Sequence, residues 1–525
     1  MIHHGRPSLV SNRRALFRIT ESARRDLEKL VFSRHPDREW GSFCWFGYRK
    51  TPWGLALSYA SPLPPNPGDL RRDSGIVSFN PDYIDRAVDE LADSRLALGV
   101  VHSHPAGCAV FPSGLDDDMD NHFGREMFPP FAPDRPYASL IVNRSADGAL
   151  EFSGRVLFEG EWLPVSTIYS AGEALVRIES SISAQKPPPL TEDTLRVLKR
   201  WLGLVDRASV DRLRRSVVGI VGCSGTGSPA IEVLARAQIG EFVLVDPDRL
   251  SYSNIERVHG SKISDLKVHP PPYKVQIMAR MIREVNPSAK ITIIAGSSLD
   301  PICIDELLRC DLIFGCTDSN NGRAHLGDLA SRYLVPVIDV GVLPDGEGGR
   351  ISQQMTEIMR LSPDDACPFC HGRIDAAALS AEIMSLEEIE EAEFQAEEAK
   401  NRGDDPDPYW QGRPAQLPSV GYHTTLGGAL AGGYGLNWIL QTAEMPHSRF
   451  QFDHGAKGFG FCPAESAANP DCGCERFKGH SDQAELSITK PKHLQPAEIV
   501  SELAPEISKG WIARAFGWLK SIWRK

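Results

Sequence analysis

Long apolar runs are missing from this sequence. No stretch reaches the roughly 18 consecutive apolar residues expected of a membrane-spanning helix, and the first thirty residues lack the apolar core of a secretory leader. We therefore expect a cytoplasmic protein. A surplus of positive charge is missing as well, since the formal net charge is −12. We expect no binding to nucleic acid, because a general nucleic-acid-binding protein needs a basic surface.

Cysteine is present, but not in the pattern of a disulfide framework. Of the eleven cysteines, four form two close pairs, Cys367/Cys370 and Cys472/Cys474. Without a secretory leader, close pairs favour a metal site over disulfides, and four thiolates from two knuckles are typical of a structural zinc ion. The second pair is one residue shorter than usual. Cys462 is therefore an alternative ligand, and reduced cysteines without metal are the remaining interpretation.

The chain is long enough for two or three domains, and changes in composition mark the boundaries. Residues 1–180 mix helical patterns with short β-rich runs. Residues 181–195 contain three consecutive prolines and are typical of an extended linker. Strand and helix patterns then alternate within residues 196–485, which predicts a mostly parallel sheet with crossover helices. Residues 486–525 form a tail. The expected fold class is therefore α/β.

Two histidines follow each other at spacing two in the apolar run LALGVVHSHP. Both imidazoles, of His102 and His104, project from the same face of an extended segment. Asp116 is the natural third ligand, because two imidazoles and a carboxylate make a zinc site with an open position for water. Such a zinc lowers the pKa of its water toward about 7, and a carboxylate outside the ligand set must then move the proton. The alternative is a strand end capped by histidines beside a solvated acidic turn.

This part of the sequence resembles the JAMM (MPN-type) metalloprotease family, whose pattern is Glu…His-x-His-Pro…Ser-x-x-Asp. The positions that match the pattern are Glu39, His102, His104, Ser113 and Asp116. The resemblance implies a JAMM α/β domain in which the two histidines and the aspartate hold zinc, the serine helps to hold the oxyanion, and the glutamate is catalytic. Eight residues separate the second histidine from the serine, one more than in the common form. Asp117 and Asp118 therefore remain alternative ligands.

A glycine-rich turn separates a strand-like run from a helix-like run in VVGIVGCSGTGSPAIEVLARA. Gly222, Gly225 and Gly227 allow the tight turn and let the backbone approach phosphates at a helix N-terminus. Asp246 ends the next strand-like run, where an acidic group can bind ribose hydroxyls. The glycine spacing GxxGxG departs from the GxGxxG of dinucleotide-binding proteins, so the loop alone does not define the nucleotide.

The next segment, DPDRLSYSNIER, resembles the signature of the ubiquitin-activating enzyme/ThiF/MoeB superfamily, and the resemblance runs over about residues 196–480. The further matching positions are Asn254, Arg257, Lys274 and Asp318. In the family these are the nucleotide-contacting asparagine, the phosphate-binding arginine, the ATP lysine and the aspartate that holds magnesium. The resemblance implies a Rossmann-like adenylating domain that uses ATP and Mg²⁺ and forms a homodimer. Arg196 or Arg200 matches an arginine that often reaches the partner subunit's ATP.

Adenylation needs residues of these types. When a C-terminal carboxylate attacks the α-phosphate, negative charge develops, and Arg257, Lys274 and Mg²⁺ can neutralise it. The thioester cysteine of ubiquitin-type activating enzymes has no counterpart, because no cysteine lies between Cys316 and Cys367 or between Cys370 and Cys462. We interpret Cys223 and Cys316 as packing residues, and we expect adenylation without a thioester on this chain.

Three other segments have a distinct composition. The acidic run at 381–400 is helical in composition and is either a solvated helix face or a cover or partner surface at the crossover. The small-residue, apolar run at 419–440 predicts a buried helix. The last nineteen residues, ISKGWIARAFGWLKSIWRK, predict a basic amphipathic helix, which binds a membrane surface or a partner or docks on its own protein.

Together the two resemblances imply a bifunctional enzyme. One half performs ATP-dependent adenylation of the C-terminal glycine of a ubiquitin-like or carrier protein. The other half performs zinc-dependent (iso)peptidase processing or deconjugation of that protein. Fusions of this kind occur in bacterial ubiquitin-like conjugation or defence-associated operons, which implies a conjugating enzyme as a further partner. The alternatives are sulfur-carrier activation and release in a cysteine or cofactor biosynthesis pathway, and a scaffold with one inactive domain.

Overall fold

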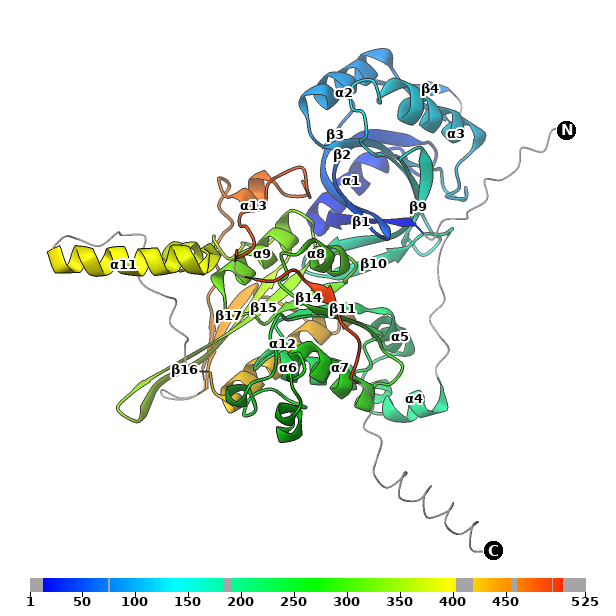
Figure 1. Cartoon of the computed structure of the whole chain (residues 1–525). Helices are drawn as coiled ribbons and strands as arrows, with labels where there is room; N and C mark the ends of the chain where they lie inside the picture. The colour runs from blue at the N-terminus through cyan, green and yellow to red at the C-terminus, as the bar shows by residue number, and fades with distance from the viewer. Residues whose placement is uncertain are drawn as a thin grey trace, which may run out of the picture.

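The computed structural model describes residues 13–73, 76–182, 191–402, 419–454, 460–492 and 494–503. Two β-sheets, each with its own helices, organise these residues (Figure 1). The first sheet is built from residues 14–179 and the second from residues 217–499. Among the described helices, none is long and apolar enough to cross a membrane. The basic amphipathic helix expected at the C-terminus lies outside the described residues.

The N-terminal sheet closes on itself. Its strands are β1 (Arg14–Thr20), β2 (Trp40–Thr51), β3 (Gly54–Leu63), β6 (Ala97–Ser103), β7 (Tyr137–Arg144), β8 (Leu150–Phe158), β9 (Glu161–Ala171) and β10 (Leu175–Glu179). They follow the order β1-β3-β2-β6-β7-β8-β9-β10, and β1 also pairs with β9. Seven strands therefore form a ring, with β10 on its rim. A separate ribbon of β4 (Leu70–Asp73) and β5 (Ile76–Phe79) lies beside it.

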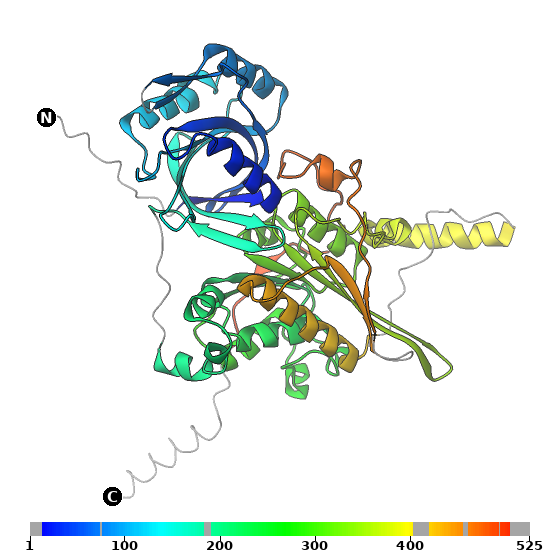
Figure 2. The ribbon, with the colours of Figure 1, turned by 180° about the vertical axis from the view of Figure 1, so that it is seen from behind.

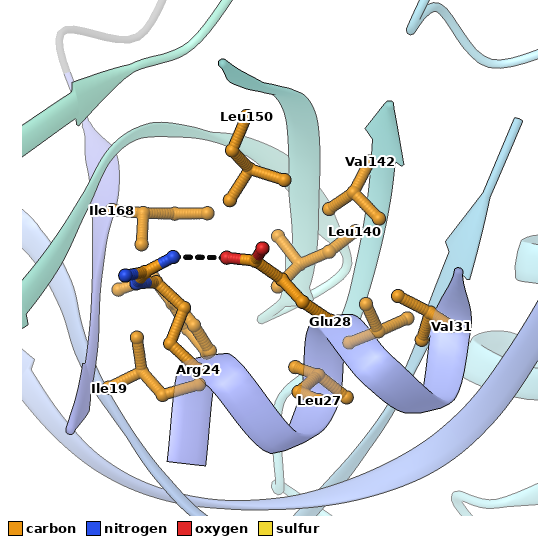
Figure 3. A pocket seen from close by; sticks show the side chains of 11 residues that line it. Ile19, Arg24, Leu27, Glu28, Val31, Leu140, Val142, Leu150 and Ile168 are labelled. Carbon is orange, nitrogen blue, oxygen red and sulfur yellow. Dashed lines mark hydrogen bonds and ion pairs between the residues drawn. The ribbon is translucent and has the colours of Figure 1, made fainter. Parts of the chain in front are cut away.

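Helix α1 (Glu21–Val31) fills the inside of this ring (Figures 1 and 2). It begins where the Thr20 hydroxyl accepts a hydrogen bond from the Ala23 amide at 3.0 Å. Leu27 and Val31 pack among apolar side chains of the strands, and the ion pair of Arg24 and Glu28 lies among them (Figure 3). Helices α2 (Pro81–Asp93), α3 (Gly114–Asn121) and η1 (His122–Met127) flank the other face of the sheet.

The second sheet is doubly wound. Its strands are β11 (Val217–Val221), β12 (Glu241–Val245), β13 (Lys290–Ala295), β14 (Leu312–Gly315), β15 (Val337–Glu347), β16 (Arg350–Leu361), β17 (Arg449–Asp453), β18 (Gly460–Pro463) and β19 (Glu498–Ile499). The five strands in the order β13-β12-β11-β14-β15 are parallel, as the alternating pattern predicted. Strand order reverses between β11 and β14, and ligands bind at such a switch point beyond the carboxyl ends of the strands.

Helices cover both faces of this sheet. Helices α5 (Arg207–Arg215), α6 (Gly227–Arg236), α7 (Lys274–Val285) and α12 (Gly421–Leu440) pack on one face. Helices α8 (Pro301–Leu307) and α9 (Asn320–Ser331) pack on the other. Helix α12 confirms the buried helix predicted at 419–440, and its glycines allow close packing: a Cβ at Gly428 would lie 2.1 Å from the Thr226 carbonyl oxygen.

The remaining elements are short or peripheral. They are α4 (Glu192–Val197), η2 (Trp201–Gly203), η3 (Tyr252–Asn254), η4 (Ile263–Lys267), α10 (Ala376–Ile383), α11 (Leu386–Arg402) and α13 (Gly473–Arg476). Helix α11 holds most of the acidic run and projects away from both sheets (Figures 1 and 2). Strand β19 falls within the expected tail and pairs with β13, so this part of the tail belongs to the second sheet.

The two sheets are joined by a chain segment from the C-terminal half that runs along β2. The Gly47 amide donates a hydrogen bond to the Gly479 carbonyl at 3.0 Å. A Cβ at Gly47 would lie 2.3 Å from the same oxygen, so the backbones meet only because Gly47 has no side chain. Further along, the hydroxyls of Ser58 and Ser481 are 3.0 Å apart and buried. The barrel and the doubly wound sheet therefore form one packed unit.

Candidate functional sites

The glycine-rich loop connects β11 to α6 at the switch point of the second sheet. Gly222 has a φ of +93°, and a Cβ there would lie 2.4 Å from the Cys316 carbonyl oxygen. Gly227 begins α6, and its Cβ would lie 1.9 Å from the Gly222 carbonyl oxygen. Both positions therefore require glycine. A Cβ at Gly225 would meet the side chain of Thr424 at 3.0 Å, a tighter approach than usual.

Asp246 ties the loop to the end of β12. Its Oδ2 accepts a hydrogen bond from the Cys223 amide at 2.7 Å, and its Oδ1 accepts one from the Asp248 amide at 2.8 Å. The side chain is buried, and burial raises the pKa of Asp246 although the charge of Lys274 opposes the rise. The carboxylate is thus fixed at the position where the sequence predicts contact with a ribose.

Lys274 is the first residue of α7 and is itself buried. Its Nζ donates a hydrogen bond to Asp248 Oδ2 at 2.7 Å. Burial alone would lower the pKa of Lys274, but the carboxylates of Asp246, Asp248 and Asp318 outweigh it and raise the pKa. The site therefore contains a charged ammonium group at neutral pH. Asp248 was not among the residues predicted from the sequence, although its place in DPDRLSYSN, two residues after Asp246, marks it as a neighbour.

Asn254 and Arg257 lie on the short helix η3 and just after it. The Asn254 Oδ1 accepts hydrogen bonds from the Ser251 amide at 3.1 Å and from its hydroxyl at 2.9 Å, which fixes the start of η3. Arg257 Nη1 donates to the Ser253 carbonyl at 2.7 Å. The Ser228 hydroxyl, in the first turn of α6, donates to the Arg257 carbonyl at 3.3 Å. The motif is therefore anchored beside the N-terminus of the helix that follows the glycine loop.

Asp318 follows β14, directly before α9, and is exposed. Glu382 of α10 caps α9, because its two carboxylate oxygens accept hydrogen bonds from the amides of Asn320 at 3.0 Å and Asn321 at 2.7 Å. Helix α10 is thereby held against the loop that carries Asp318. Sequence reasoning treated the acidic run as a unit and missed this single carboxylate.

Four sulfur atoms converge beside helix α9. Cys367 Sγ lies 3.7 Å from the sulfur atoms of both Cys370 and Cys472, and Cys370 Sγ lies 3.7 Å from that of Cys474. A tetrahedral zinc ion with Zn–S bonds of about 2.3 Å needs sulfur atoms about 3.8 Å apart. The set therefore fits a zinc ion without rearrangement. Cys462 lies on β18 and is exposed, outside this group.

The two histidines of the N-terminal domain meet Asp116 at the end of β6. His102 Nε2 lies 3.1 Å and His104 Nε2 lies 3.8 Å from the carboxylate oxygens of Asp116. Zinc with bonds of about 2.0–2.1 Å to nitrogen and oxygen needs tetrahedral ligands about 3.4 Å apart. His104 Nδ1 lies 2.8 Å from the Ala109 carbonyl. It must therefore carry the proton, and Nε2 keeps its lone pair for a metal.

Burial distinguishes this set from a solvated turn. His102 is 1% exposed, its Nε2 lies 3.1 Å from the Asp116 carboxylate, and its Nδ1 has no hydrogen-bond partner among the described residues. A buried nitrogen without a partner is costly unless a further group binds it. Burial by itself would raise the pKa of Asp116, but His102 and Ser113 outweigh it and lower the pKa. The other candidate ligands, Asp117 and Asp118, are exposed, and Asp117 pairs with Arg155 at 2.5 Å.

Glu39 precedes this cluster in the chain, and Ser113 lies within it, between His104 and Asp116. Ser113 is the N-cap of α3, and it exchanges hydrogen bonds with Asp116 at 2.6 and 3.3 Å. Its Oγ accepts in that cap, so its O–H group remains available as a donor. Glu39 directly precedes Trp40, which pairs with Ser103, the residue between the two histidines. Glu39 Oε2 accepts a hydrogen bond from the Val77 amide at 3.2 Å.

The cysteines near the nucleotide loop are poor nucleophiles. Cys223 and Cys316 are both buried. Burial raises the pKa of the Cys223 thiol and raises that of Cys316 to about 12. Both are therefore protonated at neutral pH and unreactive. Arg196, a candidate for reaching a partner subunit, is exposed and pairs with Glu192 at 2.6 Å within its own helix.

A parallel sheet with a glycine loop, an acidic strand end and a buried lysine at its switch point defines a nucleotide-binding α/β unit. The chain belongs to the ThiF family, whose model matches residues 198–474. This match covers the second sheet except its edge strand β19, and it does not include the N-terminal barrel.

Individual relatives match shorter stretches. The tRNA threonylcarbamoyladenosine dehydratase of Haemophilus influenzae is 28% identical over 155 residues, which are 29% of this chain and 56% of that protein. The sulfur carrier protein ThiS adenylyltransferase of Escherichia coli is 28% identical over 151 residues, 28% of this chain and 58% of that protein. The chain thus spans about half the length of the curated relatives it matches. A crystal structure of E. coli MccB with ATP is 17% identical at a TM-score of 0.39, covering 53% of this chain and 74% of that one.

Proposed function

We propose that the C-terminal half is an ATP-dependent adenylating enzyme that activates the C-terminus of a ubiquitin-like or carrier protein. The observation that carries this proposal is the buried, charged Lys274 with Asp246 and Asp248 at the switch point of the sheet. The names of the relatives also support it, since the ThiS enzyme is an adenylyltransferase of a sulfur carrier protein and another relative is a ubiquitin-like modifier-activating enzyme.

The reaction that fits these residues is attack of a carboxylate oxygen on the α-phosphate of ATP. An oxygen–phosphorus bond forms to give the acyl-adenylate, and the bond to the β-phosphate breaks to release pyrophosphate. The Gly222 loop and the N-terminus of α6 would hold phosphates, and Asp246 would bind the ribose. Lys274 and Arg257 would neutralise the charge that develops on the phosphates. Asp318 would hold Mg²⁺, which screens the leaving pyrophosphate.

For the N-terminal half we propose a zinc-dependent peptidase or isopeptidase of the JAMM type. The supporting observation is the cluster of His102, His104 and Asp116, in which both histidines are buried and His102 Nδ1 has no hydrogen-bond partner among the described residues. Zinc bound there would polarise the scissile carbonyl and acidify a water molecule. Glu39 would take the proton of that water and pass it to the leaving amine, and the Ser113 hydroxyl would donate to the oxyanion.

The four-cysteine group would hold a second, structural zinc ion. It links the loop after β16, which carries Cys367 and Cys370, to the four-residue helix α13, which carries Cys474 and is capped by Cys472. A closed thiolate site of this kind supplies folding energy rather than catalysis. Together the two halves would activate a carrier and trim or release it.

Two alternatives share these sites. In a sulfur-carrier pathway the adenylate would pass to sulfur transfer, followed by hydrolytic release of the product. In a scaffold, one half would bind the carrier without reacting. A neighbouring gene for a conjugating enzyme favours ligation, and one for a cysteine synthase favours sulfur transfer.

The test uses the whole chain and a carrier with a free C-terminal glycine. Carrier-dependent exchange of labelled pyrophosphate into ATP reports adenylation, and cleavage of a peptide fused after the glycine reports the peptidase. Exchange without cleavage would restrict the proposal to the C-terminal half. No exchange with any carrier of the genomic neighbourhood would refute the adenylation proposal.

A further inference from the structure

A cavity of about 260 Å³ lies at the seam between the N-terminal barrel and the second sheet, apart from both candidate sites. Its N-terminal wall comes from β1, β9 and β10, and its C-terminal wall comes from α5, the start of β14 and the end of α12. At about 30 Å³ for each water molecule of the liquid, this space would hold roughly nine. It is therefore large enough for a small polyatomic ion with some water.

Arginines dominate the lining. The charged residues that line the cavity are Arg18, Arg177, Arg212, Arg215, Glu179 and Asp311. Both carboxylates are already engaged by Arg177, whose Nε lies 2.6 Å from Glu179 and whose Nη1 lies 3.3 Å from Asp311. Asp311 also accepts a hydrogen bond from the Val217 amide at 2.7 Å. Four arginines thus face two carboxylates, which leaves the lining with two positive charges in excess.

Arg18 is the deepest of these arginines, with 2% of its surface exposed. Its Nη2 donates to the carbonyls of Leu308 at 3.1 Å and Cys310 at 2.6 Å, so this side chain of the barrel already reaches the second sheet. Its Nε and Nη1 are buried and have no hydrogen-bond partner among the described residues. Leaving charged donors unpaired in this way is costly. The Tyr169 ring, 4.4 Å from the guanidinium, offers only partial compensation.

The opposite wall adds two arginines, Arg212 and Arg215, whose hydrogen bonds go to backbone carbonyls. Arg212 Nη1 donates to the Leu440 carbonyl at 2.7 Å, at the C-terminus of α12. Arg215 Nε donates to the Asp211 carbonyl one turn earlier in its own helix, at 3.3 Å. Both partners are neutral carbonyls. Positive charge therefore faces the cavity from both sides of the seam.

We propose that this seam binds a small oxyanion of the phosphate class, held between Arg18 of the barrel and Arg212 and Arg215 of α5. Guanidinium groups are the usual partners of phosphate oxygens, because they present several donors in a fixed plane. The ion would offset the buried positive charge of Arg18 and contact both halves of the protein at once. It would thereby fasten the barrel to the second sheet. This site is independent of the nucleotide loop and of both candidate zinc sites.

Calorimetric titration of the full chain with inorganic phosphate, and separately with pyrophosphate, tests the proposal. The expected result is one site per chain whose affinity falls at least tenfold in Arg18→Gln and in Arg215→Gln. Arg215 is exposed, so the second variant tests the site even if Arg18→Gln does not fold. Arg236→Gln is the matched control, because Arg236 is an exposed arginine of α6 that pairs with Glu232. It should bind like the wild type.

Pyrophosphate and phosphate could also bind at the nucleotide loop, so Lys274→Gln is titrated in parallel. Binding retained in this variant and lost in the two seam variants supports the proposal. Binding lost in Lys274→Gln but retained in Arg18→Gln and Arg215→Gln would overturn it, as would the absence of binding of either ion. Thermal unfolding gives a second readout: phosphate should raise the midpoint of the wild type and of Arg236→Gln, and should not raise that of Arg215→Gln.

Discussion

Lys274 Nζ lies 2.7 Å from Asp248 Oδ2, and the two side chains differ greatly in exposure, with 7% for the lysine and 63% for the aspartate. The buried cation is thus held by a carboxylate that reaches in from the surface. An ATP phosphate could replace that carboxylate without desolvating the lysine further. This arrangement holds the ammonium group in place before the reaction begins. Such preorganised groups contribute most by stabilising the negative charge that develops in the transition state.

Lys274→Ala should therefore lower carrier-dependent pyrophosphate exchange by about a hundredfold to a thousandfold, the usual cost of removing one preorganised charge from a transition state. Arg236→Ala removes an exposed cation from the neighbouring helix α6 and should leave exchange unchanged. An exchange rate within a few-fold of wild type in Lys274→Ala would contradict the role proposed for this residue.

Metal content gives a second prediction. The wild-type protein should contain about two zinc ions per chain, because the two ligand sets are independent. Cys367→Ser should lose the C-terminal ion alone and lower the unfolding temperature, since a structural zinc contributes folding energy. Cys462→Ser is the matched control and should retain both ions. Elemental analysis of the dialysed proteins measures this, and full zinc in Cys367→Ser would refute the four-thiolate site.

Variants at the N-terminal site should affect metal binding and catalysis separately. Glu39→Ala should retain zinc and lose cleavage after the carrier's terminal glycine, because Glu39 lies outside the ligand set. Asp116→Ala should lose the metal, and Asp117→Ala should retain both metal and cleavage, because Asp117 pairs with Arg155 instead. If Asp117→Ala were inactive while Asp116→Ala cleaved normally, the additional loop residue would have shifted the ligand.

The activated carrier should remain an adenylate on this chain. Cys223 and Cys316 are buried thiols with a raised pKa, so neither forms the thiolate that attacks an adenylate. We expect pyrophosphate exchange without a covalent enzyme–carrier band on a non-reducing gel. A reducible band that disappears in Cys223→Ser, Cys316→Ser or the exposed Cys462→Ser would show that one of these residues is the nucleophile.

Local patterns pointed to residues that the structure brings close together at the candidate metal sites. The spacing of His102 and His104 placed two imidazoles on one face, and both do face Asp116. The four cysteines meet in space although their two pairs are far apart in the chain. Their shared site could be predicted because each pair has a recognisable knuckle pattern of its own. In each case the chemistry depends on residues within one short segment, or on segments with a signature of their own.

Contacts between distant segments of the chain could not be predicted from the sequence. The pairing of β1 with β9, which closes the barrel, joins Ala15 to Val165. Neither strand has a sequence pattern that indicates which strand it pairs with. The approach of Gly479 to Gly47 depends on how the two halves pack. Glu382 capping α9 is one carboxylate among many in an acidic run, so composition could not single it out. The roles of such residues depend on long-range packing, which cannot be derived from local patterns in a single sequence.

A last prediction concerns the seam that joins the two halves. Arg49 of β2 donates from Nε to Asp305 of α8 at 2.7 Å and from Nη1 to Asp482 at 3.1 Å. Burial raises the pKa of Asp305, and the charge of Arg49 opposes the rise. With 13% of both the Arg49 and the Asp305 side chains exposed, this pair is largely shielded from solvent.

Arg49→Met should lower the free energy of unfolding by about 3 kcal/mol at neutral pH, because it leaves Asp305 buried without its cation. In this variant the folded-state pKa of Asp305 should rise further above its unfolded value, so ionisation favours unfolding at neutral pH. The stability gap to wild type should therefore narrow as the pH falls toward the raised pKa. Denaturant unfolding at several pH values measures this gap. Adding Asp305→Asn should recover most of the loss at neutral pH, and a gap that does not change with pH would show that Arg49 acts through packing rather than charge.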